Sequence, residues 1–115
     1  KGCQLFLSER AAYMSTEVTA VRAIVNGKVQ GVFFRKYTKM KADELGLGGQ
    51  VKNLTDRSQV EILVVGPSRG VEALLAWAGT EGSPKSQPTS VTRTVLDVAQ
   101  LPRFKDFSID RSNPD

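Results

Sequence analysis

Residues 19–46, TAVRAIVNGKVQGVFFRKYTKMKADELG, change from one periodicity to another, and this change decides the fold. Over 19–26 the side chains divide at a period of two, which predicts a β-strand. Over 33–45 apolar side chains recur every three or four residues, which predicts an α-helix. The glycines of 27–32 indicate a loop with unusual backbone angles between them, and Gly46 fits the C-terminal cap of the helix.

The rest of the chain continues the alternation of strands and helices. Ser68 is a good N-cap for a second helix, in which apolar residues recur at i, i+3, i+4 and i+7. A loop rich in Gly, Pro and Ser is expected at 79–90. Further strands are predicted at 47–53, 59–66, 91–99 and 104–110. The order β-α-β-β-α-β-β predicts an α+β fold, a ferredoxin-like sandwich with a mostly antiparallel five-stranded sheet and two helices on one face.

Length and composition fit one small domain. At 115 residues the chain has room for a single core, and we expect it over residues 19–111, after a flexible N-terminal tail at 1–18. No apolar run approaches the roughly 20 residues that cross a bilayer, and the tail lacks the pattern of a secretory signal. The single cysteine excludes an internal disulfide. A cytoplasmic monomer is therefore expected.

The charge balance and the missing histidine narrow the chemistry. The chain has 16 Lys and Arg against 12 Asp and Glu, a net charge of +4. This balance suits either a solvated basic surface or the attraction of small anions, and no basic block is dense enough to predict nucleic-acid binding. With no histidine at all, a histidine general base, a His-containing nucleophile triad and a His-containing zinc site are excluded.

Two polar features are expected at one edge of the sheet. A β-α-β crossover makes its two strands parallel, so the carboxyl ends of strands 19–26 and 47–53 lie at the same edge. The glycine loop and Arg35 follow the first of these ends, and Asn53 lies at the second. One strand separates the two ends, which corresponds to roughly 9–10 Å.

The glycine loop and the start of the helix after it suit an anion. Backbone N–H groups and the positive end of the helix dipole favour negative charge there. Arg35 and Lys36 lie in the first helical turn, where a cation is unfavourable unless an anion is bound beside it. The alternatives are a tight turn without a ligand, an exposed surface arginine, and an Asn53 that only closes a turn.

Several motifs resemble those of the acylphosphatase family. GKVQGVFFR at 27–35 is similar to the family signature G-x-V-Q-G-V-x-F-R at every fixed position. The pattern A-x-x-L-G-L-x-G is present at 42–49, and GQVKN at 49–53 is similar to the second signature, G-W-V-x-N. VEALLAW followed by GSP is similar to the family's second helix and its exit, so the resemblance covers about 20–110.

The resemblance implies a hydrolase that cleaves the carboxyl–phosphate bond of acyl phosphates by direct attack of water. It implies neither a metal, a cofactor nor a phosphoenzyme. Arg35 would bind the phosphate and stabilise its charge, and Asn53 would position the attacking water. The implied partners are a small-molecule acyl phosphate and its product, inorganic phosphate, with no membrane. The implied phosphate-binding residues are Lys28, Val29, Gln30, Gly31, Val32, Phe33 and Arg35.

Two features depart from the family pattern. Gln50 stands where the family commonly has Trp, and we expect this to alter packing near Asn53. The hairpin that follows, TDRSQVE at 55–61, lacks the usual glycine and is expected to be one residue longer. The position of Asn53 therefore depends on more than the signature itself.

The missing histidine fits the implied reaction. The leaving group is a carboxylate whose conjugate acid has a pKa of about 4, so it can depart without a general acid. Two alternatives are a non-catalytic acylphosphatase-like regulatory domain and an RNA- or anion-binding module. RNA-binding sheets of this class use aromatic side chains on the open face, whereas Phe33, Phe34 and Trp77 fall on the predicted helices.

Overall fold

The computed structural model describes residues 17–112, so most of the tail expected at 1–18 lies outside the described residues. The predicted order of strands and helices is confirmed, with a short 3-10 helix, η1, added before the last strand. In chain order the elements are β1 (Val18–Lys28), α2 (Phe34–Leu45), β2 (Gly48–Asn53), β3 (Gln59–Pro67), α3 (Ser68–Thr80), β4 (Gln87–Leu96), η1 (Val98–Gln100) and β5 (Phe107–Asp110).

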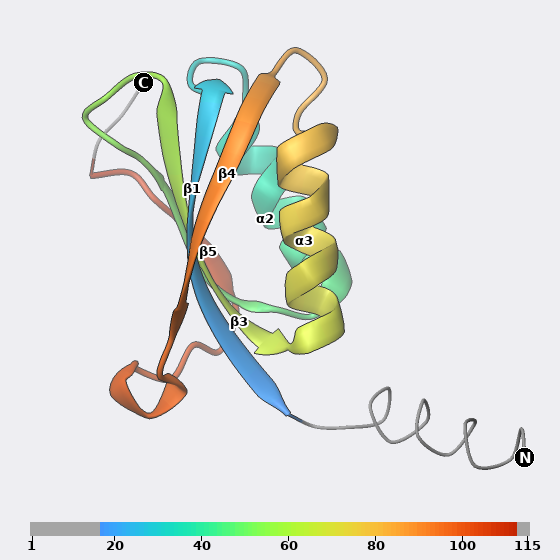
Figure 1. Ribbon diagram of the computed structural model, residues 1–115, viewed down its shortest axis with the longest axis vertical. Helices are drawn as coiled ribbons and strands as arrows, with labels where there is room; N and C mark the ends of the chain where they lie inside the picture. Colours follow the sequence, from blue (N-terminus) through green and yellow to red (C-terminus); the bar gives the residue numbers. More distant parts are fainter. Residues whose placement is uncertain (1–16, 113–115) are drawn as a thin grey trace, which may run out of the picture.

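The strands form one mixed sheet in the order β4-β1-β3-β2-β5. β1 pairs antiparallel with β3 and β4, β2 pairs antiparallel with β3, and β5 pairs parallel with β2. Helices α2 and α3 cover the same face of the sheet (Figure 1). The α+β, ferredoxin-like arrangement is therefore confirmed. β3 lies between β1 and β2, so these two strands run in the same direction and end at the same edge.

The core lies between the sheet and the two helices. Val21 and Val25 of β1 point into it and are at most 1% exposed. Phe34 of α2 and Trp77 of α3 stack with their ring centroids 5.7 Å apart, which packs the helices against each other. The apolar stripe predicted for the second helix is confirmed as its buried face: Val71, Leu74, Leu75 and Ala78.

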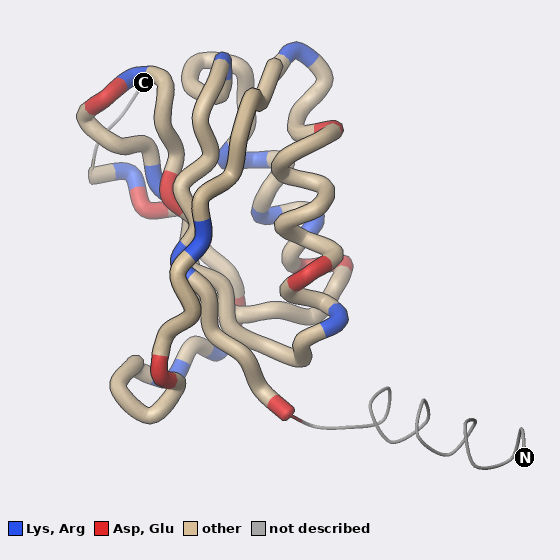
Figure 2. Tube along the Cα trace, in the orientation of Figure 1, with Lys and Arg blue, Asp and Glu red and all other residues tan. Residues whose placement is uncertain are grey.

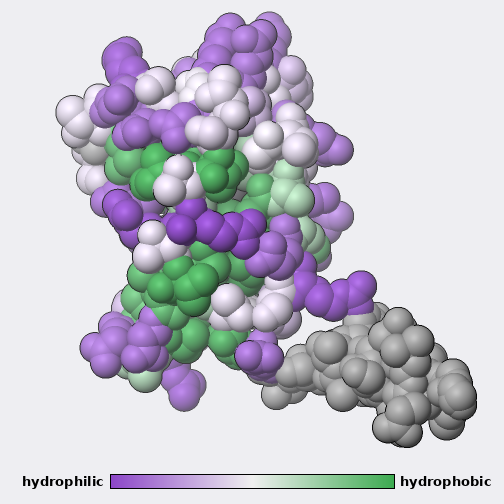
Figure 3. Space-filling model, viewed as in Figure 1, coloured by the Kyte–Doolittle hydropathy of each residue, from purple (hydrophilic) through white to green (hydrophobic). Residues whose placement is uncertain are grey.

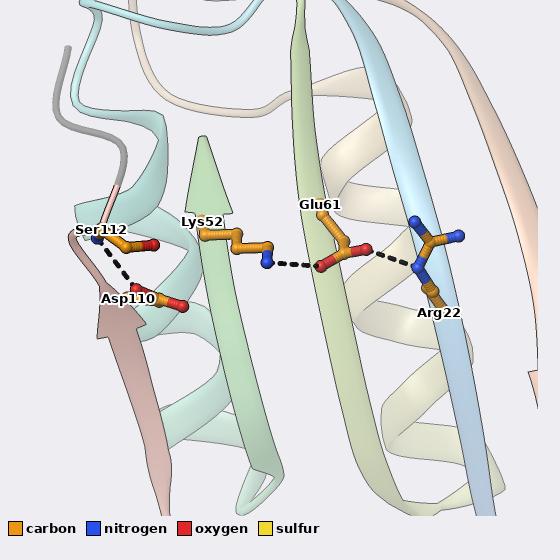
Figure 4. Close-up of polar contacts among 5 residues, drawn as sticks. All are labelled: Arg22, Lys52, Glu61, Asp110 and Ser112. Carbon is orange, nitrogen blue, oxygen red and sulfur yellow. Dashed lines mark hydrogen bonds and ion pairs between the residues drawn. The ribbon is translucent and has the colours of Figure 1, made fainter. Parts of the chain in front are cut away.

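The other face of the sheet is open and carries a row of charged side chains. Glu61 of β3 accepts a hydrogen bond from Arg22 Nε of β1, and Lys52 Nζ of β2 lies 3.8 Å from the same carboxylate (Figure 4). Asp110 of β5 lies beside Lys52 in the strand register. Charges of both signs also occur over the rest of the described chain (Figure 2). Neighbouring charges of opposite sign stabilise an exposed sheet face.

The loop predicted at 79–90 is shorter in the structure, and both of its predicted bounds were wrong. α3 continues to Thr80, and β4 already begins at Gln87. Pro88 weakens the strand signal of this segment, but β4 is an edge strand, where a residue without an N–H is tolerated. The strand predicted at 91–99 ends earlier than expected, at Leu96. Its continuation turns into η1, where the Asp97 side chain accepts a hydrogen bond from the N–H of Ala99.

Further boundaries differ from the prediction. The strand predicted from residue 104 begins only at Phe107. Pro67, not Ser68, is the N-cap of α3, because the helix already begins at Ser68. The Ser68 hydroxyl instead lies 2.7 Å from the hydroxyl of Thr19. β1 extends beyond its predicted end to Lys28, since β4 continues to pair with it as far as Gln87.

Some apolar side chains remain at the surface along β4. Figure 3 shows apolar surface on this side of the molecule. Val95 of β4 and Val98 of η1 are exposed. Exposed valines are common on globular proteins and indicate no site by themselves. Among the described residues, no helix is long and apolar enough to cross a membrane.

Gly49 of β2 is a position where the fold requires glycine. Its φ is 132°, and a Cβ atom there would lie 1.9 Å from the carbonyl oxygen of Leu63. We expect Gly49→Ala to lower the free energy of unfolding by about 3 kcal/mol or more, because strain and a backbone clash add together. Urea unfolding followed by Trp77 fluorescence measures this loss.

Gly46→Ala is the matched control. Gly46 caps α2 with φ 72°, and no atom lies within 4 Å of the position of its Cβ. The substitution should therefore cost only about 1 kcal/mol, the conformational part alone. Equal losses for the two variants would contradict the steric explanation.

Candidate active site

A pocket of about 420 Å³ lies at the edge of the sheet where β1, β2 and β5 end. These strands run in the same direction, so the loop after β1 and the ends of β2 and β5 meet there. The first turn of α2 closes the pocket. Its lining residues are Val29, Gly31, Phe33, Phe34, Arg35, Lys36, Asn53, Ile109 and Arg111.

The loop between β1 and α2 uses backbone conformations that most residues avoid. Gly31 has φ 74°, and no atom lies within 4 Å of the position of its Cβ. Phe33 has φ 60° and is the only non-glycine residue with positive φ in the described chain. This conformation costs about 1–2 kcal/mol for a residue with a side chain. The unusual loop angles expected from the glycines are therefore confirmed, and they extend to Phe33.

The side chain of Gln30 fastens this loop to the hairpin between β2 and β3. Its Nε2 donates to the carbonyl oxygens of Leu54 at 2.8 Å, Asp56 at 3.1 Å and Gln59 at 2.8 Å. All three acceptors follow Asn53 in the chain, on the hairpin that this residue begins. A single amide thus fixes the distance between the glycine loop and the strand end that carries Asn53.

The segment after α3 holds the same loop from behind. Ser83 is 1% exposed, and its Oγ donates a hydrogen bond of 2.7 Å to the carbonyl of Val32. Ser86 Oγ in turn donates to the carbonyl of Ser83 at 2.8 Å. Sequence patterns do not reveal this contact, because Val32 and Ser83 are 51 residues apart.

Arg35 lies in the first turn of α2, beside the pocket. The N-cap residue Phe33 makes no side-chain capping hydrogen bond, and the first turn contains no acidic residue. The N–H groups of a first turn have no partner inside the helix, so an anion in the pocket would meet them together with the guanidinium. The Nη1 atom of Arg35 is buried. This end of the helix therefore suits a negatively charged ligand.

Asn53 is the last residue of β2, and its side chain turns toward the pocket. It is 1% exposed, and its Oδ1 atom is buried. Val51 is buried on the same face, whereas Gln50 is partly exposed in the alternating pattern of the strand. The expectation that Gln50 alters packing near Asn53 was wrong, because residues an odd number apart in a strand point to opposite faces.

The hairpin after Asn53 closes without a glycine. The Asp56 carboxylate accepts hydrogen bonds from the N–H of Ser58 at 2.9 Å and from its hydroxyl at 2.7 Å. These hydrogen bonds hold the pKa of the Asp56 carboxyl below its ordinary value. An aspartate that bonds to the chain two residues on stabilises a tight turn by itself.

The pocket brings together part of the predicted site. Arg35 and Asn53 both line it, and so do Val29, Gly31 and Phe33 from the predicted phosphate-binding residues. The remaining three predicted residues, Lys28, Gln30 and Val32, do not line it. Lys28 is the last residue of β1, and the Gln30 side chain donates to the hairpin after β2. The side chain of Val32 is buried in the core.

Four lining residues were not predicted as site residues: Phe34 and Lys36 in the first turn of α2, and Ile109 and Arg111 at the end of the chain's last strand. Ile109 and Arg111 are the two that come from a different part of the chain. The alternation of FSIDR at 107–111 indicates that they share a face, but nothing in the sequence predicted that β5 pairs with β2. Within residues 17–112, no group of three or more Asp, Glu or Cys side chains is placed to hold a metal ion.

Comparison with known proteins identifies the family. The family profile described as Acylphosphatase matches residues 21–109. The chain belongs to the acylphosphatase family. Acylphosphatase-1 of Mus musculus is 53% identical over 83 residues, which cover 72% of this chain and 83% of the mouse protein. The acylphosphatase of Nitrosococcus oceani is 41% identical over 88 residues, covering 76% of this chain and 97% of that protein.

A solved structure of the family agrees with this fold. The crystal structure of acylphosphatase from Bacillus subtilis matches with a TM-score of 0.73 at 38% identity, over 80% of this chain and 98% of that one. The resemblance inferred from the two signatures is therefore confirmed, over nearly the range expected from the sequence.

The Gln30 contact predicts a stability effect. We expect Gln30→Ala to lower the free energy of unfolding by about 1–3 kcal/mol, because it removes a part-buried donor from three carbonyl groups. Urea unfolding measures it, and Gln100→Ala on the exposed η1 helix serves as the control. A loss no larger than that of the control would contradict the bracing role of Gln30.

Asp56 predicts a pH dependence of stability. The pKa of the Asp56 carboxyl in the folded chain lies below the ordinary 3.8. The ionised carboxylate therefore stabilises the fold at pH values above 3.8. This contribution is lost as the pH falls through the lower folded value. Asp56→Asn keeps an acceptor oxygen but cannot titrate. Urea unfolding at about pH 5 and pH 2 should therefore show a larger acid loss for the wild type than for the variant; the reverse order would refute the assignment.

Proposed function

We propose that this chain hydrolyses the carboxyl–phosphate bond of acyl phosphates by direct attack of water in the pocket beside α2. The main support is that this chain belongs to the acylphosphatase family and that its Gly31, Arg35 and Asn53 line a single pocket. The substrate is a small-molecule acyl phosphate, and the products are a carboxylate and inorganic phosphate.

The phosphoryl group is bound by the loop and the start of α2. Backbone N–H groups of the loop residues that line the pocket, Val29, Gly31 and Phe33, and of the first helical turn supply donors, and the helix dipole favours the negative charge. The Arg35 guanidinium can donate hydrogen bonds to two phosphate oxygens through its planar fork. The positive φ of Gly31 and the open space around it support this role, since the main chain can approach a ligand there without a side chain between them.

Asn53 holds the attacking water. Its side-chain amide can donate to and accept from a water molecule, and its buried position limits the directions in which it can point. The water oxygen forms a bond to phosphorus while the bond from phosphorus to the carboxylate oxygen breaks. The carboxylate leaves with the electron pair, and the water proton passes to a phosphate oxygen of the substrate.

The charges of the pocket match what this reaction needs. The transition state of phosphoryl transfer is loose, so positioning and charge stabilisation contribute most of the catalysis. Arg35 supplies charge stabilisation, and Asn53 supplies positioning. A carboxylate of pKa about 4 leaves without a proton, so a chain without histidine can run the reaction. Simple phosphate esters have alkoxide leaving groups and are expected to be poor substrates.

The non-catalytic alternatives are not favoured. The open sheet face carries charged side chains, and Phe107, the only aromatic residue in the described strands, is 1% exposed. The stacking platform of an RNA-binding sheet is therefore missing from that face of the described chain. A regulatory domain with a degraded site does not require Arg35 and Asn53 to line the same pocket.

The same proposal includes a cytoplasmic monomer. A single cysteine fits a reducing compartment. The proposed domain spans residues 19–111, which contain the matched range 21–109.

Arg35 and Asn53 predict distinct kinetic losses. With benzoyl phosphate in EDTA, we expect Arg35→Gln to lower kcat/KM about a thousandfold, because phosphate binding and charge stabilisation are both lost. Asn53→Ala should lower kcat about a hundredfold with little change in KM, since it acts on the water. Loss of benzoyl phosphate absorbance measures both.

The control for these variants is Arg103→Gln, the same charge change at an exposed residue. Its neighbour Phe104 packs at Gly48, the opposite end of β2 from Asn53. Folded wild-type protein that releases no phosphate would rule out the proposed activity. Unchanged turnover in Arg35→Gln would rule out the mechanism alone.

A further inference from the structure

We propose that Arg111 is a second guanidinium ligand of the phosphoryl group, placed beside Asn53 at the end of β5. The inference rests on the proposed function, because it deepens the description of the same pocket. It adds a binding residue that neither signature contains, since both signatures end before residue 54.

The sheet register places Arg111 next to Asn53. β5 pairs parallel with β2, and Asp110 lies opposite Lys52. Asn53 follows Lys52 as the last residue of β2, and Arg111 directly follows the last residue of β5. Both line the pocket. Arg111 therefore borders the pocket on the side on which Asn53 is proposed to hold water, where its guanidinium can reach a bound phosphoryl group.

Alternation along β5 separates the charges of this strand. Ile109 and Arg111 line the pocket, whereas Asp110 lies on the open face with Lys52 (Figure 4). Asp110 is therefore directed away from the proposed phosphate position, although it directly precedes Arg111. Successive side chains of a strand point to opposite faces, which is why one dipeptide can present a cation to the pocket and an anion to the other side.

A hydrogen bond fixes the backbone that carries Arg111. The N–H of Ser112 donates to Asp110 Oδ1 at 2.9 Å, so the chain bends directly after the strand (Figure 4). This bond lowers the pKa of the Asp110 carboxyl, and the positive charges of Lys52 and Arg35 contribute less. The carboxylate is thus ionised near neutral pH and keeps the turn closed around Arg111.

The charge of the pocket supports a dianionic ligand. Three of the residues that line the pocket are cations: Arg35, Lys36 and Arg111. No Asp or Glu is among the lining residues. A phosphate monoester carries roughly −1.5 to −2 charges at pH 7, and the phosphoryl group of an acyl phosphate is similar. In the transition state this charge spreads over three equatorial oxygens. A second guanidinium can contact oxygens that the planar fork of Arg35 does not reach.

The test measures phosphate binding directly and needs no turnover. Calorimetric titration with inorganic phosphate gives a Kd for the wild type, Arg111→Gln, Arg111→Lys and the control Arg103→Gln. We expect Arg111→Gln to raise this Kd about fivefold, the upper range for an exposed ion pair. Arg111→Lys should restore about half of the loss on a logarithmic scale, because it keeps the charge but not the fork. The control should stay within about twofold of the wild type.

Kinetics with benzoyl phosphate separate binding from chemistry. Because Arg111 contacts the phosphoryl group before and during the reaction, Arg111→Gln should raise KM about fivefold and leave kcat within about twofold. Raising the ionic strength should narrow the gap between the two proteins. A Kd and a KM for Arg111→Gln within twofold of the wild type would overturn the inference.

The two proposals fail in different ways. If the wild type hydrolyses benzoyl phosphate and Arg111→Gln binds phosphate equally well, only the role of Arg111 is lost. If the wild type binds phosphate with an Arg111-dependent Kd but releases none from benzoyl phosphate, the hydrolase is lost and the anion site remains.

Discussion

One side-chain amide joins the two halves of the pocket. Gln30 lies in the loop after β1 and donates to three carbonyl groups of the β2–β3 hairpin, which ties this loop to the strand end that carries Asn53. The carbonyls of Asp56 and Gln59 also accept backbone hydrogen bonds within the hairpin, from the N–H groups of Gln59 and Leu54, so the Gln30 amide adds a link between the loop and an already ordered turn. The loop that this contact ties to the hairpin contains the left-handed residues Gly31 and Phe33 and leads directly into α2.

The pocket beside that contact is positively charged, because three of its lining residues are Lys or Arg. The uncapped start of α2 and the cations that line the pocket attract an anion, and Asp110 and Glu61 stay on the opposite face of the sheet. The acidic side chains are kept out of the pocket although they are close to it in sequence, because successive side chains along a strand point to opposite faces of the sheet. The chain can therefore carry acidic residues close to the pocket in sequence while keeping them out of it.

The sequence predicted the order of elements and the meeting of Arg35 with Asn53, because periodicity and crossover direction are local rules. It did not predict the start of β4, since Pro88 and the surrounding glycines and serines suggest a loop unless the edge position is known. It also missed Arg111, whose role depends on the parallel pairing of β5 with β2, and the contact of Ser83 with Val32, which joins distant segments. The concern over Gln50 failed for the simplest reason, that it faces the other side of the sheet from Asn53.

The parallel pairing of β2 with β5 also has a consequence for biosynthesis. A ribosome releases the glycine loop, Arg35 and Asn53 first, and the wall formed by Ile109 and Arg111 emerges only after β3, α3 and β4. A nascent chain can thus assemble most of its sheet before the pocket is enclosed. Premature termination between the end of β2 and the start of β5 would leave a polypeptide that contains both signature motifs yet lacks one side of its binding cavity.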